Sequence, residues 1–243
     1  QIEPEDESEQ IPDYPVTVFL SKDGYLKKIT PQSLRMADTQ KFKEEDSLRA
    51  SVETTTKAEV MFFTDKHQVY KCRLTDFEDS KASVLGDYLP SKLGMDPEER
   101  VVDMVLPGDY SGSLLFFFEN GKVARVDLNA YATTSNRRRL TGAYSDKSPL
   151  VQLMHLKEDR ELVLYTNEVR AQIVSTALLA PKATRSTQGV QVMTMKPKYR
   201  LTEVRTLEDS NITNLSRYRS RSIPAAGAIL KEEDGDDQQM QLL

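Results

Sequence analysis

Lysine and arginine recur in this sequence just after a series of short turns. Phosphate groups are the usual ligands of such bases, and these contacts release counterions without reading a base sequence. One exposed base is ordinarily just solvated, so the prediction rests on recurrence. We predict that the chain binds duplex DNA in a salt-dependent and sequence-independent way. The predicted contacts are Lys27, Lys28, Lys71, Arg73, Arg125 and Arg170 after the turns, and Arg137, Arg138, Arg139, Lys182, Arg185, Lys196 and Lys198 between the repeats. Further bases follow these segments, namely Arg200, Arg217, Arg219 and Arg221.

Residues suited to catalysis or metal binding are few. The chain has two histidines, His67 and His155, and one cysteine, Cys72. They cannot supply the four ligands of a tetrahedral zinc site. The sequence also lacks a glycine-rich phosphate loop, a dinucleotide-binding fingerprint and a nucleophile elbow. We therefore expect no catalytic residue, cofactor or metal in this chain by itself.

Charge divides the chain into three parts. The net charge is −5, but residues 1–13 and 231–243 are both strongly acidic, which leaves the part between them basic. Because the acidic ends offer few large apolar groups to bury, we predict disordered tails at 1–13 and 231–243 and one DNA-binding domain at 14–230. No apolar run approaches the ~20 residues of a membrane span, and a single cysteine fits a cytoplasmic location near the nucleoid.

Short apolar runs separated by turns favour strands over helices. The first strand of each predicted hairpin covers residues 16–20, 60–64, 114–118 and 162–166, and the second covers 25–29, 69–74, 122–128 and 169–174. Asp23-Gly24 and Asn120-Gly121 are strong hairpin signals, because both residue types tolerate positive φ. Bases at alternate positions of the second strands predict one packed face and one positive face.

The hairpins recur at a period typical of stacked small sheets. Aligning Leu26, Val69, Val123 and Val169 gives spacings of 43, 54 and 46 residues. A lone hairpin is marginally stable and must pack on neighbours, so this period predicts an all-β, propeller-like disc. A fifth unit is predicted from residues 190–195, 199–204 and 222–230, and a β-sandwich remains the alternative.

Several segments resemble a known family. They are Val16–Ile29, Phe62–Thr64, Gly121–Arg125 and Thr184–Met193, of which the Gly24-Tyr25-Leu26-Lys27-Lys28 hairpin is the most specific. The sequence resembles the C-terminal domain of the A subunit of bacterial type IIA topoisomerases, DNA gyrase and topoisomerase IV, over residues 14–205. This resemblance implies a β-pinwheel of five or six four-stranded blades whose basic perimeter binds and bends duplex DNA. It also implies an acidic linker before the domain and, in some members, an acidic tail that tunes wrapping.

The resemblance implies partners and cofactors that lie outside this chain. Catalysis, which uses ATP and magnesium, would come from an ATPase B subunit and from the breakage-reunion domain of the same A subunit. The resemblance implies no membrane partner. The Gln-Arg-Arg-Gly-Gly-x-Gly box of gyrases is absent after the first hairpin, and residues 135–142 and 185–189 are degenerate echoes of it. A role like that of topoisomerase IV therefore stays open.

The main functional prediction from the sequence is an accessory domain that binds and bends DNA. Two other functions stay open. The alternative is a protein-interaction propeller without DNA binding, whose acidic ends would meet a basic partner. A hydrolase built on a propeller would need converging carboxylates.

Overall fold

The described part of the chain consists of small antiparallel sheets joined by turns and short helical segments. The computed structural model describes residues 11–133 and 138–241. These residues form four sheets of four strands each. Contacts between residues divide the chain into two compact units: unit 1 is Gln1–Asp109 with Thr133–Thr141, and unit 2 is Tyr110–Ala132 with Gly142–Leu243. The alternative of a two-sheet sandwich is therefore wrong.

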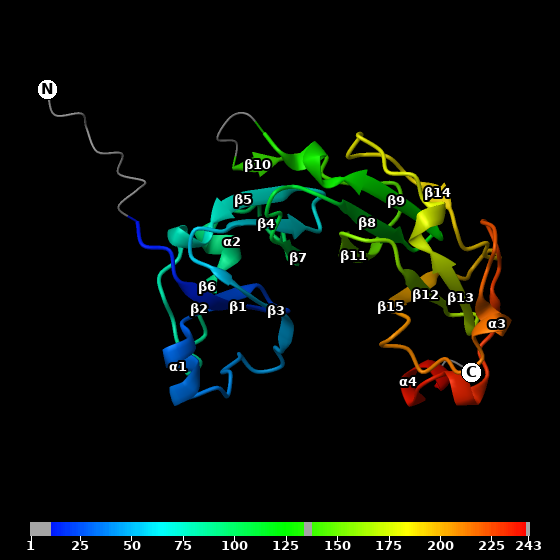
Figure 1. Cartoon of the computed structure of the whole chain (residues 1–243), viewed down its shortest axis with the longest axis horizontal. Coiled ribbons are helices and arrows are strands. Elements are labelled where there is room, and N and C mark those ends of the chain that lie inside the picture. Colours follow the sequence, from blue (N-terminus) through cyan, green and yellow to red (C-terminus); the bar gives the residue numbers. More distant parts are fainter. Residues whose placement is uncertain (1–10, 134–137, 242–243) are drawn as a thin grey trace, which may run out of the picture. The chain divides into compact units, whose positions relative to one another are not determined.

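Unit 1 contains the first two sheets (Figure 1). The first sheet has the order β3 (Leu48–Thr55), β1 (Pro15–Ser21), β2 (Tyr25–Ile29) and β6 (Asp87–Tyr88). The second has the order β10 (Arg139–Leu140), β5 (Val69–Arg73), β4 (Glu59–Thr64) and β7 (Val101–Val105). Short helical segments connect these strands: α1 (Pro31–Met36), α2 (Leu89–Lys92) and the 3-10 turn η2 (Leu74–Asp76).

Unit 2 contains the third and fourth sheets. The third has the order β11 (Leu150–Leu156), β8 (Ser113–Phe118), β9 (Lys122–Asp127) and β14 (Val190–Gln191). The fourth has the order β15 (Leu201–Thr206), β12 (Glu161–Thr166), β13 (Arg170–Ser175) and β16 (Ala228–Ile229). Its helical segments are the 3-10 turns η3 (Leu128–Tyr131), η4 (Thr176–Leu178) and η5 (Glu232–Asp234), with α3 (Leu215–Tyr218) and α4 (Asp237–Met240). No helix among the described residues has the length and apolar character needed to cross a bilayer.

Every sheet is completed by a short strand that arrives late in the chain. We call β6, β10, β14 and β16 the return strands, because each pairs with the second hairpin strand of its sheet. Strands β6, β10 and β14 reach their sheets after the chain has already formed the hairpin of the next sheet. The chain therefore returns to each of the first three sheets after it has started the next one, and within each unit the two sheets also share a core.

The four predicted hairpins are confirmed, but the fourth begins later than the sequence alignment places it. Leu26, Val69 and Val123 all pair at the end of their hairpins, opposite Leu20, Phe63 and Phe117. In the fourth sheet the equivalent pair is Tyr165 and Ala171. The aligned Val169 lies instead in the turn, with φ of 57°. A β-branched residue is uncommon at positive φ, which is why the sequence pattern missed it.

The predicted fifth unit is not a separate sheet. Residues 190–195, 199–204 and 222–230 contribute β14 to the third sheet and β15 and β16 to the fourth. The described residues thus form four sheets, and the prediction of five or six is corrected. The error has a physical origin: a strand exchanged between sheets looks, in sequence, like the start of a new repeat.

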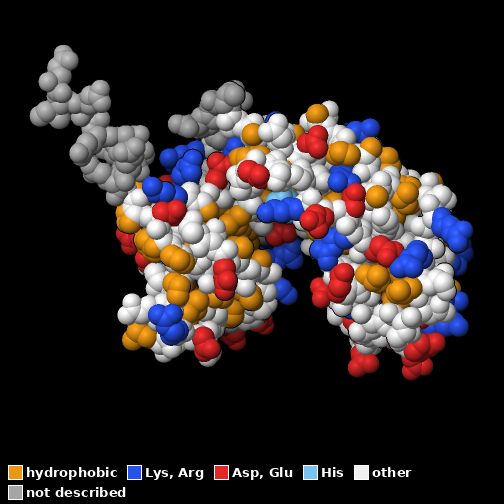
Figure 2. Space-filling model, viewed as in Figure 1, with side chains coloured by type: hydrophobic (Ala, Val, Ile, Leu, Met, Phe, Trp, Pro, Cys, Tyr) orange, Lys and Arg blue, Asp and Glu red, His pale blue; other side chains and the backbone are white. Residues whose placement is uncertain are grey.

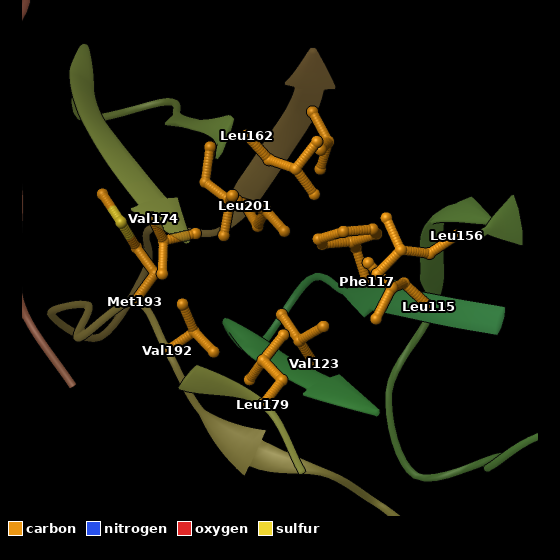
Figure 3. Packing of buried hydrophobic residues seen from close by; sticks show 12 residues of the cluster. Leu115, Phe117, Val123, Leu156, Leu162, Val174, Leu179, Val192, Met193 and Leu201 are labelled. Atoms are coloured by element: carbon orange, nitrogen blue, oxygen red, sulfur yellow. The ribbon is translucent and has the colours of Figure 1, made fainter. Parts of the chain in front are cut away.

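Apolar side chains from paired sheets form the cores. In unit 1, Val18 and Leu20 of the first sheet pack with Val60 and Phe62 of the second. In unit 2, Leu115 and Phe117 of the third sheet face side chains of the fourth, such as Leu162 and Val174 (Figure 3). Burial of one such side chain contributes about 1.5–3 kcal/mol.

The other face of the fourth sheet is covered by segments without long strands. Val163 and Ile173 of this face pack with Tyr218 and Leu230, and Met240 of α4 lies against the same cluster. The C-terminal segment therefore does what a further sheet would do, because it shields an apolar sheet face from water. Figure 1 shows α4 beside the end of the fourth sheet.

The acidic residues after 230 are folded up to residue 241. The Asp234 side chain is fully buried, and its Oδ1 accepts hydrogen bonds from the Thr213 backbone (2.7 Å) and the Thr213 hydroxyl (2.8 Å). Its Oδ2 accepts from the Tyr218 hydroxyl (2.7 Å). Arg205 Nη2 donates to Asp236 at 2.6 Å. The prediction of a disordered tail is therefore wrong for residues 231–241, and the acidic residues 1–10 lie outside the described residues.

A glycine lets the third return strand approach its sheet. Gly189 has φ of +77°, and a Cβ there would lie 2.1 Å from the Val123 carbonyl oxygen. Gly189→Ala should lower the free energy of unfolding of the full chain by more than about 1 kcal/mol, measured by urea denaturation. Gly142→Ala is the matched control, since it has similar φ of +58° but open space around it. Equal losses in both variants would contradict the close approach.

Asp234 should make the stability of the chain depend on pH in the acid range. Burial would raise the pKa of its carboxyl, but hydrogen bonds from Thr213 and Tyr218 outweigh burial and lower that pKa to about 2. An unfolded aspartate titrates near pH ~4, so this stabilisation is complete above that pH and is lost as the pH falls toward 2. Asp234→Asn should cost about 1–3 kcal/mol at neutral pH, with a difference from wild type that shrinks between pH 4 and 2. The exposed Asp237→Asn variant should behave like wild type, and a pH-independent difference for Asp234→Asn would contradict the assignment.

Candidate nucleic-acid interface

Three of the predicted DNA-binding lysines are buried. Lys27, Lys28 and Lys71 are 3%, 4% and 9% exposed. The Lys27 Nζ donates to the carbonyl oxygens of Lys41 (3.1 Å) and Ala82 (3.2 Å), and burial lowers the pKa of this amine. The prediction that these second-strand bases form an exposed positive face is therefore wrong. The strands are packed on both faces, so their bases cannot alternate between protein and water.

Lys28 and Lys71 are held by segments of unit 1 that come later in the chain. The Lys28 Nζ donates to the carbonyl oxygens of Leu74 (3.0 Å) and Phe77 (2.5 Å). The Lys71 Nζ donates to the Thr133 hydroxyl at 3.3 Å. A buried ammonium costs free energy unless it is paired or hydrogen-bonded, and these carbonyl and hydroxyl oxygens supply that compensation.

Arginines of the second hairpin strands are also tied to the protein. The Arg125 guanidinium is 16% exposed and lies 3.0 Å from Asp159. The Arg170 Nε lies 3.4 Å from Glu168, and its Nη1 donates to the Gly227 carbonyl. Arg73 is exposed, and its Nη1 donates to the Lys57 carbonyl. These contacts leave the second strands with little charge for a ligand.

The predicted arginine run at 137–139 has three different outcomes. Arg137 lies outside the described residues. Arg138 is exposed. Arg139 lies over the ring of Tyr70 at 5.6 Å from its centroid, and it donates to Gln68 (2.6 Å) and Asp96 (2.9 Å). Arg139 thus joins the return strand β10 to the hairpin turn of the second sheet.

The bases between the repeats are the exposed ones. Lys182, Lys196 and Lys198 are exposed, while Arg185 is half-buried and donates to the Ala130 carbonyl. Lys196 is 70% exposed, with Glu168 at 3.3 Å. This part of the predicted set is available to a ligand.

Two acid-free stretches carry these bases in unit 2. Residues 180–200 contain five bases and no Asp or Glu: Lys182, Arg185, Lys196, Lys198 and Arg200. Residues 210–231 contain four bases and no Asp or Glu: Arg217, Arg219, Arg221 and Lys231. Counting charge in windows of about 20 residues would have found both from the sequence.

The two stretches lie side by side. Met193 and Ala225 form a parallel bridge. The Thr194 N–H donates to the Ala225 carbonyl (2.9 Å), and the Ala225 N–H donates to the Val192 carbonyl (3.1 Å). We call this paired region, residues 180–200 and 210–231, the basic surface of unit 2. Figure 2 shows Lys and Arg side chains gathered on the α3 side of this unit and acidic side chains near α4.

Four bases of this surface are not engaged by the described part of the chain. Lys182, Lys198, Arg221 and Lys231 are exposed, and the structure gives their side chains no hydrogen bond or ion pair among the described residues. Arg219, by contrast, makes a two-point contact with Glu161 at 2.7 and 2.8 Å. Unengaged cations gain most from a phosphate, because no existing contact has to be broken.

The equivalent segment of the first sheet has the opposite charge. Residues 75–88 lead to the return strand β6 and contain four acids, Asp76, Glu78, Asp79 and Asp87, against the single base Lys81. A polyanion would be repelled there and attracted to the basic surface. The segment that leads to β6 therefore has a charge opposite to that of the basic surface of unit 2.

Burial perturbs two of the side chains that can take part in catalysis, Cys72 and His155. Burial raises the pKa of the Cys72 thiol to about 12, so it stays protonated and unreactive at neutral pH. Burial also lowers the pKa of His155. Among the described residues, no three His, Cys, Asp or Glu side chains cluster as metal ligands. A cavity of about 250 Å³ near α4 is lined by Tyr165, Thr166 and Glu203 among others.

Comparison with known proteins agrees with this architecture. The family model described as the DNA gyrase C-terminal domain, beta-propeller, matches residues 58–83 and 180–208, and the second range contains the whole basic stretch 180–200. The chain is 28% identical over 120 residues to the A subunit of DNA topoisomerase 4 from Bacillus subtilis, covering 48% of this chain and 15% of that protein. It is 21% identical over 211 residues to the same subunit of Staphylococcus epidermidis, covering 85% of this chain and 26% of that protein.

Solved structures share the fold. The C-terminal domain of DNA topoisomerase IV superposes with a TM-score of 0.71 and 23% identity, over 82% of this chain and 64% of that one. The E. coli ParC C-terminal domain gives a TM-score of 0.70 and 16% identity, over 90% and 94%. The chain is similar to the C-terminal domains of gyrase and topoisomerase IV A subunits. The resemblance predicted from the sequence is thus confirmed, and the chain spans about a quarter or less of these curated relatives.

Buried and exposed lysines should respond differently to loss of charge. Lys28→Met removes the donor for two buried carbonyls, so the free energy of unfolding should fall by about 1–3 kcal/mol. Lys198→Met, at an exposed side chain, should change it by less than about 0.5 kcal/mol. Urea denaturation of the full chain measures both. An unchanged free energy of unfolding in Lys28→Met would show that the buried amine has no structural role.

Proposed function

We propose that the chain binds duplex DNA through the basic surface of unit 2, as an accessory domain of a type IIA topoisomerase A subunit. The observation that carries this proposal is the pairing of two acid-free basic stretches through the Met193 and Ala225 backbone. The similarity to gyrase and topoisomerase IV A subunits supports the accessory role.

The chemistry of the surface favours phosphate over bases as the ligand. Lys182, Lys198 and Arg221 are flexible point contacts on irregular segments, and no helix in the described part of the unit has the length to fill a major groove. Contacts of this kind give affinity through counterion release and little sequence preference. Bending of a longer duplex would follow if added backbone contacts offset its deformation energy.

The remaining parts of the proposal concern the parent enzyme. Strand passage with ATP and magnesium, in the cytoplasm, would be carried out by the breakage-reunion domain of the same subunit together with an ATPase B subunit. The chain itself would position DNA and supply no catalytic group. We propose neither gyrase nor topoisomerase IV activity in particular, because the gyrase box has only degenerate echoes here.

Charge removal on the basic surface should weaken binding in a salt-dependent way. The probes are duplexes of about 20 bp and about 150 bp, titrated with the full chain across a salt series. The magnitude of the slope of log affinity against log salt is close to the number of phosphates that the protein neutralises. Substituting Lys182, Lys198 and Arg221 by Gln should therefore reduce that magnitude by about 3. Tighter binding of the longer duplex would support bending.

A matched control separates the surface from net charge. Substituting Lys22, Lys66 and Lys81 by Gln removes the same charge from exposed positions of unit 1, and it should leave the slope within about one charge of wild type. Equal effects of the two triple variants would contradict the assigned surface. Wild-type binding without salt or length dependence would overturn DNA binding and favour a protein-interaction module.

A further inference from the structure

A base occupies the same register position in the second hairpin strand of three sheets. Lys28 pairs opposite Val18, Lys71 opposite Met61 and Arg125 opposite Leu115. In the fourth sheet this position is Ile173, opposite Val163. The change from base to apolar residue requires an explanation that phosphate binding cannot give, because these side chains point into the protein.

Lys28 and Arg125 bind the same feature of the next sheet. The Lys28 Nζ donates to the carbonyls of Leu74, the first residue of η2, and Phe77, which follows that turn. The Arg125 Nη1 donates at 3.0 Å to the carbonyls of Thr176, the first residue of η4, and Leu179, which follows it. The Leu74 and Thr176 carbonyls also accept the N–H groups of Phe77 and Leu179, which close the two turns. The buried cation therefore adds a second hydrogen bond to the first carbonyl of the turn and binds the carbonyl of the residue after it.

The bound turn begins the segment that carries the exposed bases. The Lys182 N–H donates to the Arg125 carbonyl at 2.8 Å, and the Asp127 N–H donates to the Lys182 carbonyl at 2.8 Å. Arg125 therefore holds this segment twice, at η4 through its side chain and at Lys182 through its backbone. Ser80 is held by the Lys28 carbonyl in the same way in the first sheet.

Ile173 shows what happens where no further sheet follows among the described residues. Its side chain is fully buried, and its carbonyl still accepts from the Ser220 N–H at 3.0 Å. The backbone half of the arrangement is kept, while the cationic half is replaced by an apolar side chain. In the first and third sheets the cation at this position binds the 3-10 turn of the next sheet, and in the fourth sheet the position is apolar.

We infer that Arg125 is a positioning residue for the basic surface: its guanidinium fixes η4 and thereby the placement of Lys182 and Arg185. The inference rests on the proposed function for its effect on DNA, but the effect of Arg125 on η4 does not depend on DNA. Arg125 does not contact the ligand in this assignment. Its charge is already used by the Thr176 and Leu179 carbonyls and by Asp159.

Hydrogen exchange tests the positioning role without DNA. Arg125→Leu, which imitates Ile173, should speed exchange of the Leu179 and Lys182 amides at least about tenfold. Arg125→Lys, which imitates Lys28, should stay within about threefold of wild type. The Ser80 amide in unit 1 is the internal control and should not change. Unchanged exchange at Leu179 and Lys182 in Arg125→Leu would overturn the inference.

A second variant covers the case in which Arg125→Leu does not fold. Arg125→Gln keeps a polar side chain but is too short to reach both carbonyls, so it should give the same pattern of faster exchange. Faster exchange spread evenly over unit 2 in this variant, instead of concentrated at residues 176–191, would overturn the positioning role in favour of a general loss of stability.

Affinity for the duplex of about 150 bp tests the link to DNA. Arg125 acts through Lys182 in this inference. The fold-loss of affinity caused by Lys182→Gln should therefore be at least about threefold smaller in the Arg125→Gln background than in wild type. Lys198→Gln should have the same effect in both backgrounds. Equal losses for Lys182→Gln in both backgrounds would overturn the link. Absence of wild-type DNA binding would instead overturn the proposed function, while the exchange pattern still tests the role of Arg125 at η4.

Discussion

The structure depends on the need to cover small sheets that cannot stand alone. A two-stranded hairpin buries too little apolar surface to be stable in water. Each hairpin here gains a third strand and a short return strand, and three return strands arrive after the next hairpin has formed. Strand exchange therefore couples neighbouring sheets, and the long connections that it requires run over the surface.

Those connections explain why buried and exposed bases have different tasks. The second hairpin strand is packed on both faces, so Lys28 and Arg125 are largely shielded from solvent and bind carbonyls of the following turn. The connection after that turn is exposed, so Lys182 is available to a ligand. The same residue type is thus structural in the strand and available in the connection a few tens of residues later.

The fourth sheet shows how an apolar face can be covered without another sheet. One face of the fourth sheet packs on the third, and the other would be left in water. Tyr218, Leu230 and Met240 cover it, and the buried Asp234 ties the C-terminal segment to residues 213–218. An acidic composition favours disorder only while no specific partner exists for its carboxylates. Here backbone N–H groups and a tyrosine hydroxyl provide those partners.

The sequence by itself determined the four hairpins, because alternating turn signals and β-rich runs are local features. It also determined the resemblance to topoisomerase A subunits and the shortage of residues for a zinc-ligand set. Tertiary structure alone decided that Lys27, Lys28 and Lys71 are buried, that residues 190–204 complete existing sheets, and that Asp234 is packed. These outcomes depend on which distant segments meet, and strand spacing carries no information about that. A periodic base has the same pattern in sequence whether it faces solvent or the next sheet, so only packing could separate the two.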